Sequence, residues 1–188
     1  MEKYLFYDLE TTGTKFWKNG IHQISGAIKI DGEIKERFDF KVRPFEKALI
    51  EEEALKVAGV TMEQIMAYPS MREVYLKITA MLGKYVDKFN KKDKFHLVGY
   101  NNASFDNPFF RAFFVQSNDN YFGSWFWSDS IDVMVMASYK LRKVRHELTD
   151  FKQATVAKYL GIEIDETKLH DAEYDIDVCM KILDILEA

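Results

Sequence analysis

The order of its apolar segments is what most constrains this chain: strand-like segments come first, and helix-like segments dominate afterwards. Residues 3–9 read as a buried strand, and residues 21–30 and 33–43 read as two more strands around Asp31-Gly32, a dipeptide that favours a tight hairpin. Strands that first meander and then alternate with helices predict an α/β fold, a mixed sheet flanked by helices. The later segments are helices at 47–58 and 71–89, a strand at 95–100, and helices near 104–117, 131–141, 149–160 and 171–187.

Composition limits the class of protein. The chain has 188 residues, 47% hydrophobic and 15% aromatic, which predicts one domain over residues 1–188 with a sizeable core. Its 26 basic and 30 acidic residues give a net charge of −4, unlike a protein coated for nonspecific duplex binding. The lone cysteine, Cys179, rules out an internal disulfide and favours a reducing compartment. No leader pattern or membrane-length apolar run is present, so we expect a soluble, cytoplasmic protein with no membrane partner.

Two acidic residues stand at the end of the first strand-like run, Asp8 and Glu10 in Asp-Leu-Glu-Thr-Thr-Gly. A strand places residues i and i+2 on one face, so the two carboxylates point the same way. At about 6–7 Å apart they repel each other unless a cation lies between them. Hard divalent ions such as Mg²⁺ prefer such oxygen ligands. The pair therefore indicates a metal site, and the alternative is an acidic strand end that turns into a Thr-Gly loop.

A third acid, Asp106, closes the run Gly-Tyr-Asn-Asn-Ala-Ser-Phe-Asp, which begins at Gly99. This run occupies a strand-to-helix junction, where open α/β sheets build their sites. Pro108 supports a helix start here. Asp106 is a candidate site residue, and the alternative is a first-turn charge that complements the helix dipole. The helix that follows has an apolar stripe of Phe109, Phe110, Phe113 and Phe114.

Helix geometry separates the acids near the C-terminus. At about 100° per residue, Asp177 and Asp184 fall on the solvated face of the last helix, whereas Asp175 heads its core-facing stripe. A carboxylate in that position is costly unless it is paired or binds a metal. Asp175 is therefore the acid that structure alone explains least. The stripe consists of Val178, Cys179, Ile182 and Leu186, which makes Cys179 an inert core thiol.

His170 precedes this helix and is a candidate general base. Asp171 suits the helix N-cap and Glu173 suits the positive end of the dipole, so both are expected to be structural. His170 would then lie in the loop beside Asp175. A histidine next to clustered carboxylates can accept a proton near neutral pH.

With these motifs the chain resembles the DEDDh 3′→5′ exonucleases of the ribonuclease H-like superfamily, which include the proofreading epsilon subunit of bacterial DNA polymerase III. Asp8 and Glu10 match the first motif, Asp106 the second, and His170 and Asp175 the third. The resemblance covers nearly the whole chain and implies a ribonuclease H-like mixed sheet of about five strands flanked by helices. The segments 50–55 and 59–61 also look like this family's region after the third strand.

One departure bears on the subfamily. The epsilon-like pattern has His-Asn-Ala before Phe-Asp, whereas here Asn101-Asn102 and one additional residue precede it. Together with Trp125 and Ser130-Ile-Asp-Val-Met, this is closer to the nuclease domain of bacterial exonuclease I. The chain has no room for that enzyme's further C-terminal domains, so its processivity and exact subfamily stay open.

The resemblance also implies a mechanism and a substrate. Two divalent ions, Mg²⁺ or Mn²⁺, would be held by the four acids, with Asp8 as the bridge and His170 as the base. The implied activity is a metal-dependent 3′→5′ exonuclease on single-stranded DNA that releases nucleoside monophosphates, alone or as a proofreading partner of a polymerase. The alternatives are an exoribonuclease, which contact with a 2′-OH would distinguish, and a catalytically silent binding module. The family's 3′-end pocket maps onto Leu9, Thr11, Asn102 and Phe105.

Two further segments are candidates for strand contacts. Phe16-Trp17-Lys18 could place an aromatic ring beside terminal bases, and the alternative is a hydrophobic anchor. A basic run could meet phosphates, and the alternative is a solvated face. The run consists of Lys140, Arg142, Lys143, Arg145 and His146.

Overall fold

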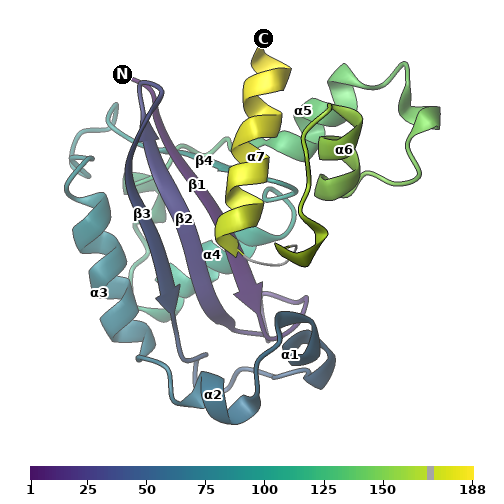
Figure 1. Cartoon of the computed structure of the whole chain (residues 1–188). Coiled ribbons are helices and arrows are strands. Elements are labelled where there is room, and N and C mark those ends of the chain that lie inside the picture. The colour runs from purple at the N-terminus through teal and green to yellow at the C-terminus, as the bar shows by residue number, and fades with distance from the viewer. Residues whose placement is uncertain (169–171) are drawn as a thin grey trace.

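Five strands form one mixed sheet in the computed structural model, which describes residues 1–168 and 172–188 (Figure 1). The order across the sheet is β3-β2-β1-β4-β5, which places β1 at the centre. The first three strands form an antiparallel meander, and β4 and β5 add in parallel, so the predicted mixed sheet is confirmed. The strands are β1 (Lys3–Thr11), β2 (Ile21–Ile30), β3 (Glu33–Lys41), β4 (His96–Gly99) and β5 (Ile131–Asp132).

The β2–β3 hairpin has the turn that its sequence predicts. Asp31 (φ 47°) and Gly32 (φ 85°) both have left-handed backbone, as a type I′ turn requires. Glycine adopts this conformation at no steric cost, and aspartate tolerates it better than most residues. The turn sets the register in which Ile30 lies opposite Glu33.

Helices cover both faces of the sheet (Figure 1). The face that carries α3 and α4 is packed by one apolar cluster, and α5, α6 and α7 pack the other face with a second. The helices are α1 (Glu52–Ala58), α2 (Met62–Met66), α3 (Met71–Leu82), α4 (Asp106–Gln116), α5 (Val133–Lys140), α6 (Gln153–Tyr159) and α7 (Ala172–Glu187). No helix among the described residues is long and apolar enough to cross a bilayer.

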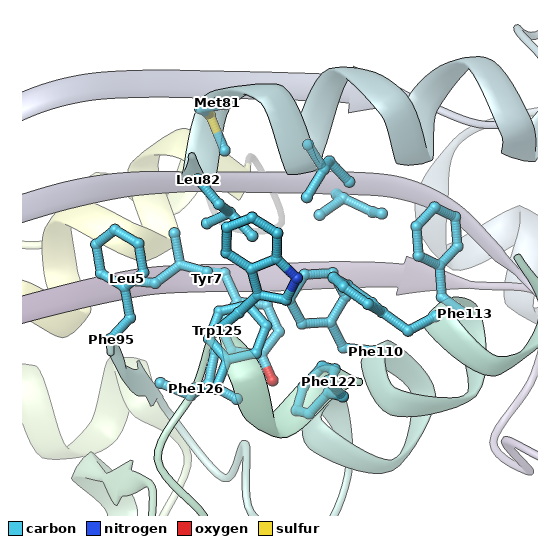
Figure 2. Close-up of a cluster of buried hydrophobic side chains, with 14 of the residues drawn as sticks. Leu5, Tyr7, Met81, Leu82, Phe95, Phe110, Phe113, Phe122, Trp125 and Phe126 are labelled. Atoms are coloured by element: carbon cyan, nitrogen blue, oxygen red, sulfur yellow. The ribbon is translucent and has the colours of Figure 1, made fainter. Parts of the chain in front are cut away.

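The alternation of β1 assigns its side chains to the two cores. Leu5, Tyr7 and Leu9 point into the α3/α4 core, whose aromatic centre is drawn in Figure 2, whereas Phe6 points into the α7 core. Residues two apart share a face, so Asp8 and Glu10 lie on the Phe6 side, toward α7. The pattern that buries β1 therefore also aims both carboxylates at α7.

Some predicted helices have different bounds. The helix predicted over 71–89 ends at Leu82, because turns take over from Gly83 and leave Phe89 85% exposed. The helix predicted over 47–58 begins only at Glu52. Helix α2 was not predicted, although Thr61 and Gln64 form the capping box that marks its start. The segment predicted as helix over 131–141 opens with the two-residue strand β5.

Candidate active site

The candidate site lies where β1 runs past its neighbour β4. The last pairing between these strands joins Phe6 to Val98, and β1 continues to Thr11. Asp8 and Glu10 stand on this extension, both half-buried. The predicted common face of the two acids is therefore present at an edge where the sheet opens.

Asp106 meets this extension from the first turn of α4. Its side chain is 4% exposed, and its Oδ1 accepts a hydrogen bond of 3.2 Å from the Leu9 N–H. Burial, followed by the charge of Asp8, raises the pKa of Asp106 well above its ordinary value, and Glu10 adds to the effect. Three of the predicted acids are thus close enough to raise the cost of each other's charge.

Asp175 approaches from α7. It is half-buried, and burial followed by its negative charge raises the pKa of Glu10 to about 6, while Lys41 opposes the shift. A small cavity between β1 and α7 is lined by Asp8, Asp175 and Gln153, and Gln153 Nε2 donates to the backbone oxygen of Asp175 at 2.6 Å. The fourth predicted acid therefore shares this cavity with Asp8 and lies close enough to Glu10 for their charges to interact.

The other acids of α7 take the structural positions that helix geometry predicts. Asp177 accepts a 2.7 Å bond from Arg37 Nη2 on β3, and Asp184 pairs with Lys29 Nζ on β2 at 2.9 Å. Both remain 44–58% exposed, so these are surface ion pairs of small energetic weight. His170, the predicted base, lies outside the described residues, as does Asp171.

The donor set is suited to a hard divalent cation. Carboxylates that are buried together and raise one another's pKa are relieved of repulsion by a metal ion between them. Among the described residues, no three His, Cys, Asp or Glu side chains are close enough to hold a metal as they stand. Mg²⁺ characteristically uses one or two carboxylates and completes its shell with waters and substrate phosphates, so a partly assembled ligand set is compatible with it.

The residues predicted to hold a terminal nucleotide differ in how far their side chains are already engaged in the fold. The Leu9 side chain is buried in the core, and Thr11 donates its hydroxyl hydrogen to the Gly13 carbonyl at 2.7 Å. Phe105 is half-buried with its ring 5.3 Å from that of Phe109. These three side chains are largely engaged by the fold.

Asn102 differs from them. It is 0% exposed, yet neither its Nδ2 nor its Oδ1 has a hydrogen-bond partner among the described residues. It packs against Gly99, where an added Cβ would come within 2.9 Å of the Asn102 Cβ. A buried amide without partners is costly, which makes Asn102 the predicted substrate residue with the most unused bonding capacity.

Asp132 was not predicted as a site residue. Its side chain caps α5 by accepting from the N–H groups of Met134 (3.0 Å) and Val135 (3.3 Å). It also accepts from the N–H groups of Asn101 (3.0 Å) and Ala103 (3.2 Å) in the loop that carries Asn102. Asp132 thereby fixes the loop before Asp106. An aspartate at a helix start is the one sequence signal that could have identified it.

Comparisons with known proteins identify the family of the chain. The model of the RNase_T family, described as an exonuclease family, matches residues 5–183. The PolC-type DNA polymerase III of Mycoplasmopsis pulmonis is 24% identical over 182 residues, which are 96% of this chain and 11% of that protein. The enzyme of the same name from Clostridium perfringens is 29% identical over 186 residues, 97% of this chain and 11% of that protein. The chain thus spans about a tenth of the length of these relatives.

Solved structures show the fold. Escherichia coli exonuclease I in complex with a dT13 oligonucleotide superposes with a TM-score of 0.78 at 21% identity, over 100% of this chain and 41% of that one. A zinc-bound form of its single-stranded DNA complex gives a TM-score of 0.78 at 21% identity, over 100% of this chain and 40% of that one. The predicted ribonuclease H-like fold is confirmed by this likeness.

Proposed function

Because the chain belongs to the RNase_T exonucleases, DEDD enzymes of the ribonuclease H-like superfamily, we propose that it is a metal-dependent 3′→5′ exonuclease acting on single-stranded DNA. The observation that carries the proposal is that Asp8, Glu10, Asp106 and Asp175 lie near one another where β1 runs past the end of β4. The oligonucleotide bound in the exonuclease I structure and the polymerase names of the sequence relatives support a DNA strand as substrate.

The carboxylates of Asp8, Glu10, Asp106 and Asp175 would hold Mg²⁺ or Mn²⁺. A pair of such ions activates a water and neutralises the charge that develops on the phosphate. The chain contributes one buried and three half-buried acids, whose repulsion a bound cation would relieve. Binding of a cation would offset the unfavourable free energy of holding these like charges close together.

The remaining residues would orient the strand end and move the proton. His170 would accept the proton of the attacking water. The Asn102 amide would donate to or accept from the terminal nucleotide, since no described residue satisfies it. The backbone of Leu9 and the hydroxyl of Thr11 would contact the terminal sugar, and Phe105 would lie near the last nucleotides. The product would be a nucleoside monophosphate.

The proposed setting is proofreading or repair, as a free enzyme or together with a DNA polymerase. Both sequence relatives described above are PolC-type polymerases, of which a segment like this chain forms about a tenth.

The decisive experiment uses 5′-labelled single-stranded DNA and RNA of matched sequence, incubated with Mg²⁺, with Mn²⁺ or with EDTA. We expect a ladder that shortens from the 3′ end, requires metal and disappears in Asp175→Asn. The matched control is Asp177→Asn on the same helix, which removes a surface ion pair with Arg37 and leaves the ladder intact. Full activity in Asp175→Asn would overturn the site, and faster cleavage of RNA would identify an exoribonuclease.

The role of His170 needs a separate measurement. His170→Ala is expected to slow turnover severely while metal binding, followed by calorimetry, stays close to that of the wild type. Loss of metal binding would show instead that His170 is a ligand.

A further inference from the structure

A cavity of about 630 Å³ opens beside the candidate site, on the outer side of α4. Its walls come from the loop after β1, from α4 and from the segment between α4 and α5. Ala103 and Asn107 line it. They are next to Asn102 and Asp106 in the chain, which places the cavity near the candidate site.

The lining has an unusual charge for this protein. The chain as a whole is acidic, with a net charge of −4, yet none of the lining residues within the described ranges is acidic. Arg111 carries the one charge among them, and its guanidinium carbon lies 4.6 Å from the centroid of the Phe122 ring. Trp17, Trp127 and Val115 add apolar surface. Aromatic walls with a single cation complement a ligand that has flat apolar faces and negative charges.

The loop that presents Trp17 is anchored. Asn19 Oδ1 accepts from the Lys15 N–H at 2.9 Å, and its Nδ2 donates to the Leu49 carbonyl at 2.9 Å and to Glu51 Oε1 at 3.1 Å. The loop backbone on both sides of Trp17 is therefore anchored, although the residue is 67% exposed.

The two aromatic residues of this loop have different roles. Phe16 is 39% exposed and packs edge-on against Phe109, with ring centroids 6.5 Å apart. Trp17 packs edge-on against Phe16 at 5.2 Å and leaves most of its surface to solvent. Of the two interpretations of this segment, Phe16 fits the hydrophobic anchor and Trp17 fits the stacking surface.

We propose that this cavity binds the single strand on the 5′ side of the terminal nucleotide, with bases against Trp17 and Trp127 and a backbone phosphate at Arg111. The proposal rests on the proposed function, because it assumes that the acidic site holds the strand end. The volume lies within the range of about 300–1,000 Å³ typical of small-ligand pockets, enough for one or two nucleotides. The cavity would thus add affinity for a strand without reading its sequence.

The test measures binding of fluorescent dT12 by anisotropy in the Asp175→Asn background, which prevents degradation. Trp17→Ala is expected to weaken binding about tenfold, since stacking on one aromatic ring contributes about 1–3 kcal/mol per base. Arg111→Gln should reduce the slope of log affinity against log salt by about 0.7, the contribution of one phosphate contact on a single strand. Trp17→Phe and Arg111→Lys should recover most of each effect.

Matched controls exclude general effects of removing a ring or a charge. Phe89→Ala removes a ring that is 85% exposed and does not line the cavity, and Arg72→Gln removes a guanidinium that stacks on Tyr75 at 5.8 Å. Neither should change dT12 affinity or its salt slope. Unchanged affinity and slope in both Trp17→Ala and Arg111→Gln would overturn the proposal and leave the cavity to an apolar protein partner.

A second substrate separates this proposal from the proposed function. The p-nitrophenyl ester of thymidine 5′-monophosphate has a terminal nucleotide but no strand on its 5′ side. With the otherwise wild-type enzyme, cavity variants should raise KM for dT12 much more than KM for the ester. Equal changes for both substrates would overturn the cavity assignment. If the wild type cleaves neither substrate, the proposed function fails, while the dT12 binding measurements still decide whether the cavity holds a strand.

Discussion

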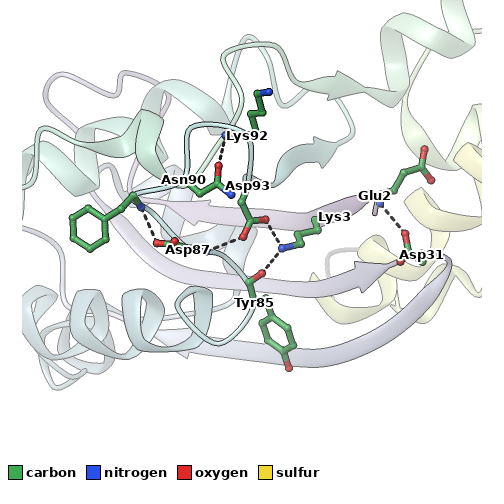
Figure 3. A network of polar contacts seen from close by, with 9 residues as sticks. Glu2, Lys3, Asp31, Tyr85, Asp87, Asn90, Lys92 and Asp93 are labelled. Atoms are coloured by element: carbon green, nitrogen blue, oxygen red, sulfur yellow. Dashed lines mark hydrogen bonds and ion pairs between the residues drawn. The ribbon is translucent and has the colours of Figure 1, made fainter.

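Charged side chains lie at both ends of β1, but opposite charges pair at the start of the strand and like charges lie close together at its end. At the start of the strand, Lys3 pairs with Asp93 and donates to the Tyr85 carbonyl at 2.5 Å, and Asp93 also accepts from the Asp87 N–H at 3.0 Å (Figure 3). Although burial alone would raise it, hydrogen bonds from Lys3 and the Asp87 N–H lower the pKa of Asp93.

At the far end of the same strand, burial and neighbouring acids raise the pKa of Glu10 and of Asp106. The first end joins opposite charges, and the second concentrates like charges. Burying like charges destabilises a fold unless something that binds there relieves them. The start of β1 is therefore expected to stabilise the fold, whereas the acids at its end suit the proposed metal site.

The largest expected effect is on catalysis at the acidic end. Asp106→Asn keeps an acceptor for the Leu9 N–H but removes a buried charge. We expect activity to fall by at least about 10²–10³-fold, the usual cost of removing one electrostatic group from an active site. The melting temperature of the metal-free variant should equal or exceed that of the wild type. The control is Asp119→Asn, which lies beyond the other end of α4 and should keep its activity.

A mutation at the start of β1, where Lys3 pairs with Asp93, should change the stability of the protein rather than its activity. Lys3→Met keeps the apolar stem but leaves Asp93 without its cation and the Tyr85 carbonyl without its donor. Removing one partner of a largely buried pair is expected to lower the free energy of unfolding by about 2–3 kcal/mol. Denaturant titration measures this loss, and Lys35→Met, which breaks a surface pair with Glu33, should show almost none. A catalytic defect in Lys3→Met at a temperature where it is folded would contradict the comparison.

Adding metal should change the free energy of unfolding by a smaller amount, and the change should depend on the acidic end of β1 only. At about 10–100 times the dissociation constant, Mg²⁺ or Mn²⁺ should raise the free energy of unfolding of the wild type by about 1–3 kcal/mol. Lys3→Met should gain the same amount, and Asp106→Asn should gain little. Thermal melts with and without EDTA measure the gain, and equal gains in all three proteins would show that the ion binds elsewhere.

The smallest expected effect is in pH dependence. The folded pKa of Glu10 is about 6, against an ordinary 4.5, so between these values the folded protein binds more protons than the unfolded chain. Stability relative to Glu10→Gln should therefore fall as the pH rises from 4.5 to 7 without metal, by about 1 kcal/mol after allowing for solvent screening.

Asp93 should show the opposite sign. Its folded pKa lies below the ordinary 3.8, so its contribution is present above that value and is lost as the pH falls through the folded pKa. Urea titrations of Glu10→Gln and Asp93→Asn across pH measure both trends. The same sign of slope at both ends of β1 would refute the contrast between them.

Local patterns predicted much of the fold because they report which face of an element is buried. The alternation of β1, the Asp31-Gly32 turn and the stripe of α7 needed no tertiary information. Helix ends were harder to predict. Apolar spacing continues past Leu82, but turns begin at Gly83, and Val86 is buried in the core without being part of a helix. Periodicity does not distinguish these two routes to burial.

The acids of the candidate site could be predicted from the sequence, whereas the residues and segments around them, such as Asp132, could not. Helix phase distinguished Asp175 from Asp177, and the structure gives Asp177 a surface partner, Arg37. The role of Asp132 depends on a loop 29–31 residues away in the chain. The cavity at Trp17 and Arg111 likewise requires three distant segments to meet.

By itself, the sequence determined that β1 ends in paired acids, that Asp106 opens a helix and that Asp175 faces inward, because spacing along an element sets the direction of each side chain. Only the tertiary structure decided that the charges of these acids interact, that the buried Asn102 amide has no partner among the described residues and that a cavity without acidic lining residues lies nearby. Distances between elements depend on how the two cores pack on either side of β1, and no local pattern encodes them.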